Sequence, residues 1–130
     1  MKAPRSGGVR LAASAALLLL AAPVGNAAAQ DWVPRQTAAL QVLDKVTARI
    51  SVLRATVGQA AQYGTLSILV RACNARPPEE VPDAAAFLEM TDSRRAGGAQ
   101  QVFRGWMFAN APGVSMLEHP VYDVRVLDCR

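Results

Sequence analysis

One histidine, His119, is the residue on which any imidazole chemistry in this chain depends. Ser115 and Asp123 lie near it in the sequence, and a serine, a histidine and an aspartate can together form the triad of a hydrolase. Their spacing does not fix a geometry, and the sequence lacks the Gly-x-Ser-x-Gly pattern of a nucleophile elbow. We therefore expect His119 to hold its loop through a hydrogen bond, and a small hydrolase using His119 is kept as an alternative.

Paired carboxylates and metal ligands give no stronger prediction. Glu79 and Glu80 lie in a proline-rich run, whereas Asp123 and Asp128 lie near the two ends of one expected strand. Two carboxylates across a cleft can hydrolyse a glycosidic bond, but this chain is short for such a cleft. One histidine and two cysteines are too few for a usual metal cluster, and no glycine-rich phosphate-binding pattern occurs. No catalytic residue, metal site or cofactor is therefore predicted.

The two cysteines, Cys73 and Cys129, each end an expected strand, and by alternation each falls on the less apolar face of its strand. A disulfide between them is favoured in an exported domain of about 100 residues. It would close a loop of 57 residues, and the chain-entropy model gives about 4 kcal/mol of stabilisation for such a loop. Because the sequence has no Cys-x-x-Cys motif, a redox-active pair is disfavoured. Two free thiols remain the alternative.

One segment, Phe103–Phe108 (FRGWMF), merits attention as a binding element because both of its faces are largely apolar. It could be a central strand that is buried on both sides. It could also leave one face partly open, so that its aromatic side chains and the loop Asn110–Pro120 form a recognition patch. Such a patch would stack on a sugar or anchor a partner protein. The candidate surface residues are Trp106, Met107, Leu117, His119, Tyr122 and Arg125.

The length and charge of the chain limit the elements that can position these residues. The 130 residues suffice for one small domain, and 52% hydrophobic with 18% charged residues is typical of a folded protein. The formal charge of +4 is uneven, because residues 1–29 hold three basic residues and no acidic one. The remainder has eleven basic and ten acidic residues, a net charge of +1. This balance gives no case for nucleic-acid binding.

Residues 1–29 have the pattern of a secretory signal peptide, with a basic start, an apolar run from Leu11 to Ala22, and Ala27–Ala29 before the expected cleavage site. The apolar run is too short for a permanent membrane span, although an uncleaved anchor is the alternative. No cysteine follows the run and no paired arginines precede it, which favours the general export route. We therefore expect a periplasmic protein with no stable transmembrane segment after cleavage.

The mature chain is expected to form one all-β domain over residues 46–130, preceded by an arm or short helix over residues 30–45. Residues 36–45 carry apolar side chains at helical spacings, whereas from Val46 the apolar period becomes two. Gly58–Gly64 is expected to be a turn region and Arg76–Asp83 (RPPEEVPD) a loop. These features predict a small barrel or sandwich of about five to six mostly antiparallel strands. The expected strands are Val46–Arg54, Thr65–Cys73, Ala86–Thr91, Gln101–Ala109 and Val121–Cys129.

Three segments resemble a known family, namely Thr65–Cys73 (TLSILVRAC), Arg76–Glu80 (RPPEE) and the long run Gly105–Cys129. The family is the secreted alphaproteobacterial group of domain of unknown function 2155, and the resemblance covers about Val42 to Arg130. It implies a bacterial envelope protein with a signal peptide, and it implies no activity. Members of the family often have tryptophan at the position of Arg125, so a binding face there would be less apolar in this chain.

These observations together favour a non-catalytic interaction module of the cell envelope whose partner is another envelope protein. A carbohydrate- or peptidoglycan-binding module is the alternative that uses the same aromatic residues.

Overall fold

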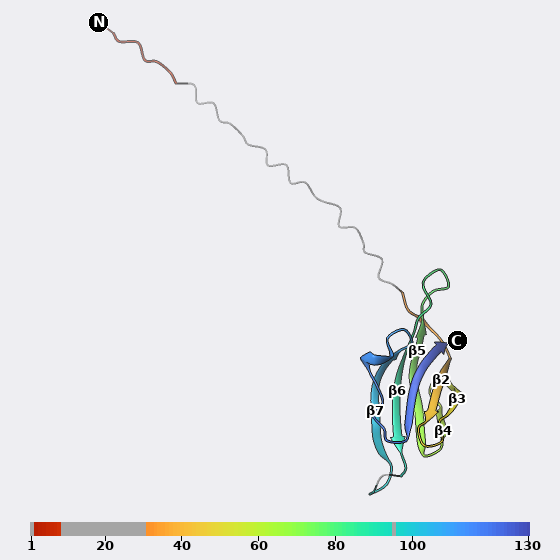
Figure 1. The fold of residues 1–130 in the computed structure, drawn as a ribbon. Helices are drawn as coiled ribbons and strands as arrows, with labels where there is room; N and C mark the ends of the chain where they lie inside the picture. Colours follow the sequence, from red (N-terminus) through yellow and green to blue (C-terminus); the bar gives the residue numbers. More distant parts are fainter. Residues whose placement is uncertain (1, 9–30, 95) are drawn as a thin grey trace.

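The computed structural model describes residues 2–8, 31–94 and 96–130, and it shows an all-β domain (Figure 1). The described residues contain no α-helix and a single short 3₁₀ turn, η1 (Pro112–Val114). The strands are β1 (Val33–Pro34), β2 (Thr37–Asp44), β3 (Arg49–Thr56), β4 (Ala60–Tyr63), β5 (Leu66–Ala75), β6 (Ala84–Asp92), β7 (Gln100–Phe108) and β8 (Tyr122–Cys129).

The strands form two antiparallel sheets. In the first sheet, β5, β6 and β7 are consecutive neighbours, and the short strands β1 and β4 both pair with the other side of β5. In the second sheet, β2 lies between β3 and β8. One cluster of buried side chains draws on both sheets, which makes the fold sandwich-like. The sequence prediction of an all-β fold is therefore confirmed.

The core follows the alternation of apolar residues in the strands. In β5, Leu66, Ile68 and Val70 have no exposed side-chain area, as their period of two predicted. In β8, Tyr122 and Val124 are buried on the core side, whereas Arg125, between the buried valines, points to solvent as a candidate surface residue should.

Two β-bulges turn the cysteines into this core. The alternation in sequence placed both cysteines on the less apolar faces of their strands. An extra residue, Arg71 in β5 and Leu127 in β8, interrupts each pairing register and exchanges the two faces beyond it. Cys73 and Cys129 are therefore buried, and they form a disulfide with their Cα atoms 5.6 Å apart. The predicted disulfide is present, and it links β5 of one sheet to β8 of the other.

The predicted brief helix over residues 36–45 is wrong, because this segment is strand β2. Its spacing fits both periods, but Ala38, Leu40 and Val42 are the residues that are fully buried, and they repeat every second position. A central position between two strands satisfies the backbone on both sides of β2 and decides in favour of the strand.

The next strand is also shifted from its prediction. The carboxylate of Asp44 accepts hydrogen bonds from the N–H groups of Val46 and Thr47, which makes a turn there, so that β3 starts only at Arg49. Ile50 and Val52, which carry the two-residue apolar period of the predicted strand, are more than half exposed. Beyond β3, the expected turn region Gly58–Gly64 contains strand β4.

Other loops agree with expectation. Residues 76–83 form no strand, and the connection after β6 turns at Gly97 and Gly98, whose φ angles are positive. The expected signal peptide lies outside the described residues except for residues 2–8. No helix among the described residues is long and apolar enough to cross a membrane.

Candidate functional site

The segment between β7 and β8 is a long connection, residues 109–121, that returns along the sandwich to the start of β8 (Figure 1). Pro112 and Pro120 have no backbone N–H to donate to a ladder, and this segment forms no strand. Its apolar anchor is Leu117, which is buried in the core cluster. We call residues 110–120 of this connection the return loop.

His119 attaches the return loop to the sandwich. Its Nδ1 atom accepts hydrogen bonds from the backbone N–H groups of Val121 (3.0 Å) and Tyr122 (3.1 Å). Because Nδ1 accepts two hydrogen bonds, the proton of the neutral ring lies on Nε2, which donates it to Oδ2 of Asp92 at 2.8 Å. The expected loop-holding role of His119 is confirmed, and its ring connects the start of β8 to the end of β6.

Asp92 is the charged partner in this contact. The backbone N–H of Arg94 and then the His119 side chain hold the pKa of Asp92 down from 3.8 to about 2, so the carboxylate is ionised at neutral pH. Asp92 and His119 are both buried, and their hydrogen bonds engage the polar atoms of the imidazole. Neither Ser115 nor Asp123 bonds to His119 in the described chain, so the geometry forms no Ser-His-Asp triad.

Among the strands of the described residues, none pairs with the edge of β8 that faces the return loop. The backbone N–H of Lys45 donates to the carbonyl of Val121 at 2.8 Å. This bond shows which residues of β8 direct their N–H and C=O groups toward β2. By alternation, the peptide groups of Asp123 and Arg125 point toward β2, whereas those of Val124 point to the free side. Among the described residues, no backbone hydrogen bond joins the return loop to Val124.

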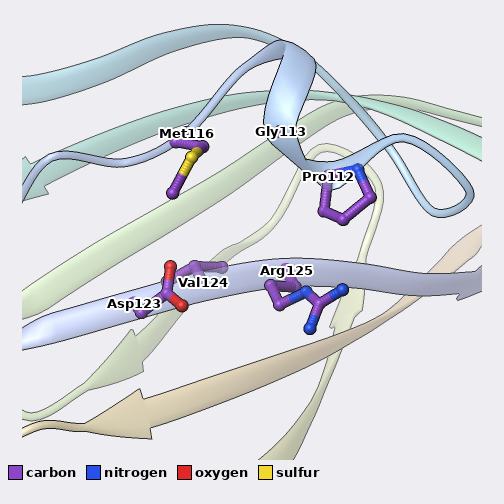
Figure 2. Close-up of a pocket in the computed structure, with 6 residues that line it drawn as sticks. All are labelled: Pro112, Gly113, Met116, Asp123, Val124 and Arg125. Carbon is purple, nitrogen blue, oxygen red and sulfur yellow. The ribbon is translucent and has the colours of Figure 1, made fainter.

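A groove of about 290 Å³ opens between this edge and the return loop. Figure 2 shows Pro112 and Met116 extending from the loop toward β8, with Asp123 and Arg125 on the strand below. Met116 is 60% exposed although it is apolar. The lining residues are Pro112, Gly113, Met116, Asp123, Val124 and Arg125.

This groove combines an apolar wall, an edge peptide group, a cation and a carboxylate. An extended peptide can use all four, because its backbone pairs with an exposed edge while its side chains enter flanking hollows. The described residues contain no cluster of three or more histidine, cysteine or acidic side chains that could hold a metal ion.

The structure divides the six surface residues expected from the sequence. Met107, Leu117, His119 and Tyr122 are each no more than 5% exposed, so their assignment to an outer surface needs correction. Met107, Leu117 and Tyr122 belong to the core cluster, and the ring of His119 is hydrogen-bonded below the surface.

The two remaining residues lie in different places. Arg125 lines the groove beside β8, whereas Trp106 lies on the outer face of the other sheet, in a separate hollow. The sequence pointed to the loop containing Met116 but missed Met116 itself. A signal was available in the sequence, because a methionine in a loop with two prolines has no neighbouring strand to bury its side chain, which favours an exposed position.

Two packed antiparallel sheets, one disulfide between them and a groove at a strand edge define a small β-sandwich domain. Residues 38–129 match the bacterial family described as "Uncharacterized protein conserved in bacteria (DUF2155)". The match covers well over half of the chain, so this protein belongs to that family, as the resemblance in sequence implied.

A curated relative is the "Uncharacterized protein RP359" of Rickettsia prowazekii (strain Madrid E), which is 24% identical over 87 residues. The alignment covers 67% of this chain and 56% of the relative, so the chain spans little more than half of that protein. No solved structure matches the chain.

Proposed function

We propose that this protein is an exported, non-catalytic interaction module of the bacterial envelope that binds an extended segment of a partner protein. The observation that supports the proposal is the free edge of β8, whose Val124 peptide group faces the groove beneath the return loop. The signal-peptide pattern and the disulfide agree with a periplasmic location.

The partner segment adds to β8 as a strand. Its backbone bonds to the N–H and C=O of Val124, and its apolar side chains contact Pro112 and Met116. Asp123 and Arg125 then select polar or charged side chains at the mouth of the groove, because each offers one sign of charge. The hydrolase alternative receives no support from His119, whose ring nitrogens already hold the loop.

A photo-reactive amino acid at position 116 tests the proposal in the native bacterium. Cross-linked products are identified by mass spectrometry, and the same label at Val46, which is exposed in the turn between β2 and β3, serves as the control. We expect a reproducible envelope protein from position 116 that is absent from position 46. Equal products from both positions, or none from position 116, would contradict the proposal.

Two substitutions in the same loop separate groove binding from a general change in charge. Met116 and Val114 are both exposed and apolar, but only Met116 lines the groove. Met116→Glu should abolish capture of the partner, whereas Val114→Glu should leave it intact, with equal thermal melting of the two variants. Loss of capture in both, or in neither, would count against the groove as the binding site.

A further inference from the structure

The outer face of the five-stranded sheet carries a second hollow, separate from the groove beside β8. Four strands meet there in register, because Pro34 of β1 faces Asn74 of β5, Asn74 faces Ala85 of β6, and Ala85 faces Phe108 of β7. Asn74 and Ala85 are thus neighbours in the middle of this row. The hollow measures about 270 Å³, and its lining residues are Trp32, Asn74, Ala85, Trp106 and Phe108.

The aromatic rings around this hollow are held by neighbouring side chains. The guanidinium of Arg76 lies over the ring of Trp32, 3.8 Å from the centroid. The ring of Trp106 meets Phe87 edge to face, with 5.5 Å between the centroids. Both indoles therefore have a partner that limits their rotation, and such preorganisation lowers the entropy lost when a ligand binds. Trp106 nevertheless remains 39% exposed.

One polar side chain stands among these aromatic residues. The side-chain amide of Asn74 makes no hydrogen bond to any residue in the part of the chain that the structure describes. It offers two donors and one acceptor oxygen to a ligand. Because small-molecule sites combine apolar, aromatic walls with a few polar groups that fix orientation, this hollow has the composition of a binding site.

We infer that this hollow binds one ring of an uncharged, N-acetylated glycan. A pyranose ring has an apolar C–H face that suits the two indoles, and its acetamido group can exchange hydrogen bonds with the free amide of Asn74. The volume lies just below the usual range for small-molecule pockets, about 300–1,000 Å³, so it suits a single ring. The inference does not rest on the groove beside β8, which shares none of these residues.

Both tryptophans of the chain line this hollow, so intrinsic tryptophan fluorescence reports on it directly. The probe is chitotriose, the uncharged trimer of N-acetylglucosamine, titrated into the exported protein with its disulfide intact. We expect saturable quenching, together with shifts of both indole N–H signals in NMR spectra. Cellotriose, which lacks acetamido groups, should bind at least about tenfold more weakly, because it leaves the Asn74 amide without its partner.

Matched variants assign the binding to these residues. Asn74→Leu and Trp106→Ala should each weaken chitotriose binding by about tenfold or more, whereas Met116→Ala, in the other groove, should not change it. For Trp106→Ala the remaining signal comes from Trp32, and thermal melting checks that the variant is folded. If about 10 mM chitotriose changed neither the fluorescence nor the indole N–H signals, the dissociation constant would be too high for a binding site, and the inference would be overturned. Undiminished binding by the folded Asn74→Leu variant, or equal affinity for cellotriose, would overturn it as well.

Discussion

Two substitutions of His119 separate the two contacts of its ring. Asparagine places an oxygen near the position of Nδ1, so His119→Asn keeps an acceptor for the N–H groups of Val121 and Tyr122 but loses the donor to Asp92. Glutamine places an N–H near the position of Nε2, so His119→Gln keeps the contact with Asp92 and leaves the two backbone groups without an acceptor. The pair therefore tests whether the ring holds the return loop through both nitrogens.

The pKa of Asp92 gives the size of the effect. Its decrease from 3.8 to about 2 corresponds to about 2 kcal/mol of folding stability at 1.36 kcal/mol per unit. Because the pKa is lower in the folded state, this stability is present above about pH 4 and is lost as the pH falls toward 2. The backbone N–H of Arg94 is the larger cause of the decrease and is unaffected by the substitutions. In His119→Asn, the pKa of Asp92 should therefore rise but remain below 3.8.

Urea unfolding at pH 6 and at pH 2.5 gives the loss of folding stability on acidification for each variant. The other carboxylates contribute equally to this loss in the two variants, so the difference between them reports on Asp92. The loss of stability on acidification should be smaller in His119→Asn than in His119→Gln, because only glutamine keeps the hydrogen bond to Asp92, and neither variant contains an imidazole that titrates. At pH 6, His119→Gln should lose about 2–4 kcal/mol, since two buried backbone donors lose their acceptor. NMR titration of the Asp92 carboxyl gives the pKa directly. An equal acid response in His119→Asn and His119→Gln would refute the assigned hydrogen bonds.

Three other perturbations test the scaffold. Replacement of Cys73 and Cys129 with alanine should lower stability by about 4 kcal/mol, seen as a fall of about 1–4 M in the urea midpoint; an unchanged midpoint would exclude a stabilising cross-link. Deletion of Leu127 should remove the bulge and place Cys129 two positions after the buried Val126, still on the inner face, so thiol labelling should find no free cysteine, as in the wild type; two labelled cysteines would contradict the assigned register. Gly64→Ala should lower the free energy of unfolding by more than about 2 kcal/mol, because the residue has a φ of +57° and an added Cβ would collide with the hydroxyl of the buried Tyr122 in β8. Gly58→Ala, with φ +85° but open space, should lose only about 1 kcal/mol, and equal melting of these two glycine variants would contradict that reasoning.

The elements that the sequence predicted well are those whose alternation is undisturbed over a long run. The first half of β5 is an example, since Leu66, Ile68 and Val70 alternate without interruption. The alternation failed beyond Arg71 and at Leu127, because a bulge exchanges inner and outer faces and has no mark in the sequence. The bulges also explain why both cysteines were assigned to the wrong face. Their pairing was predicted correctly because it depended on the number of cysteines and not on the face of the strand.

The candidate site was predicted only in outline. The return loop was expected to form a surface, but the distinction between Met116, which is exposed, and Leu117, which is buried, depends on where the loop packs. The role of His119 could be anticipated, whereas its partner Asp92 could not, because the two residues meet only when β6 and the return loop are brought together. The hollow between Trp32 and Trp106 likewise depends on the order of four strands.

The position of β2 between β3 and β8 also sets the order in which the domain can fold. Strands β4 to β7 pair with their neighbours in sequence, and β2 with β3, so both units need only short chain closures. The ladder that joins Ala38 to Cys129 must instead close across almost the whole domain, and such non-local pairing slows folding to milliseconds or seconds. The bond between Cys73 and Cys129 tethers β8 to the β4–β7 unit before that ladder forms. Oxidised chains should therefore refold faster than reduced ones, and the cross-link is then an aid to assembly as well as to the finished structure.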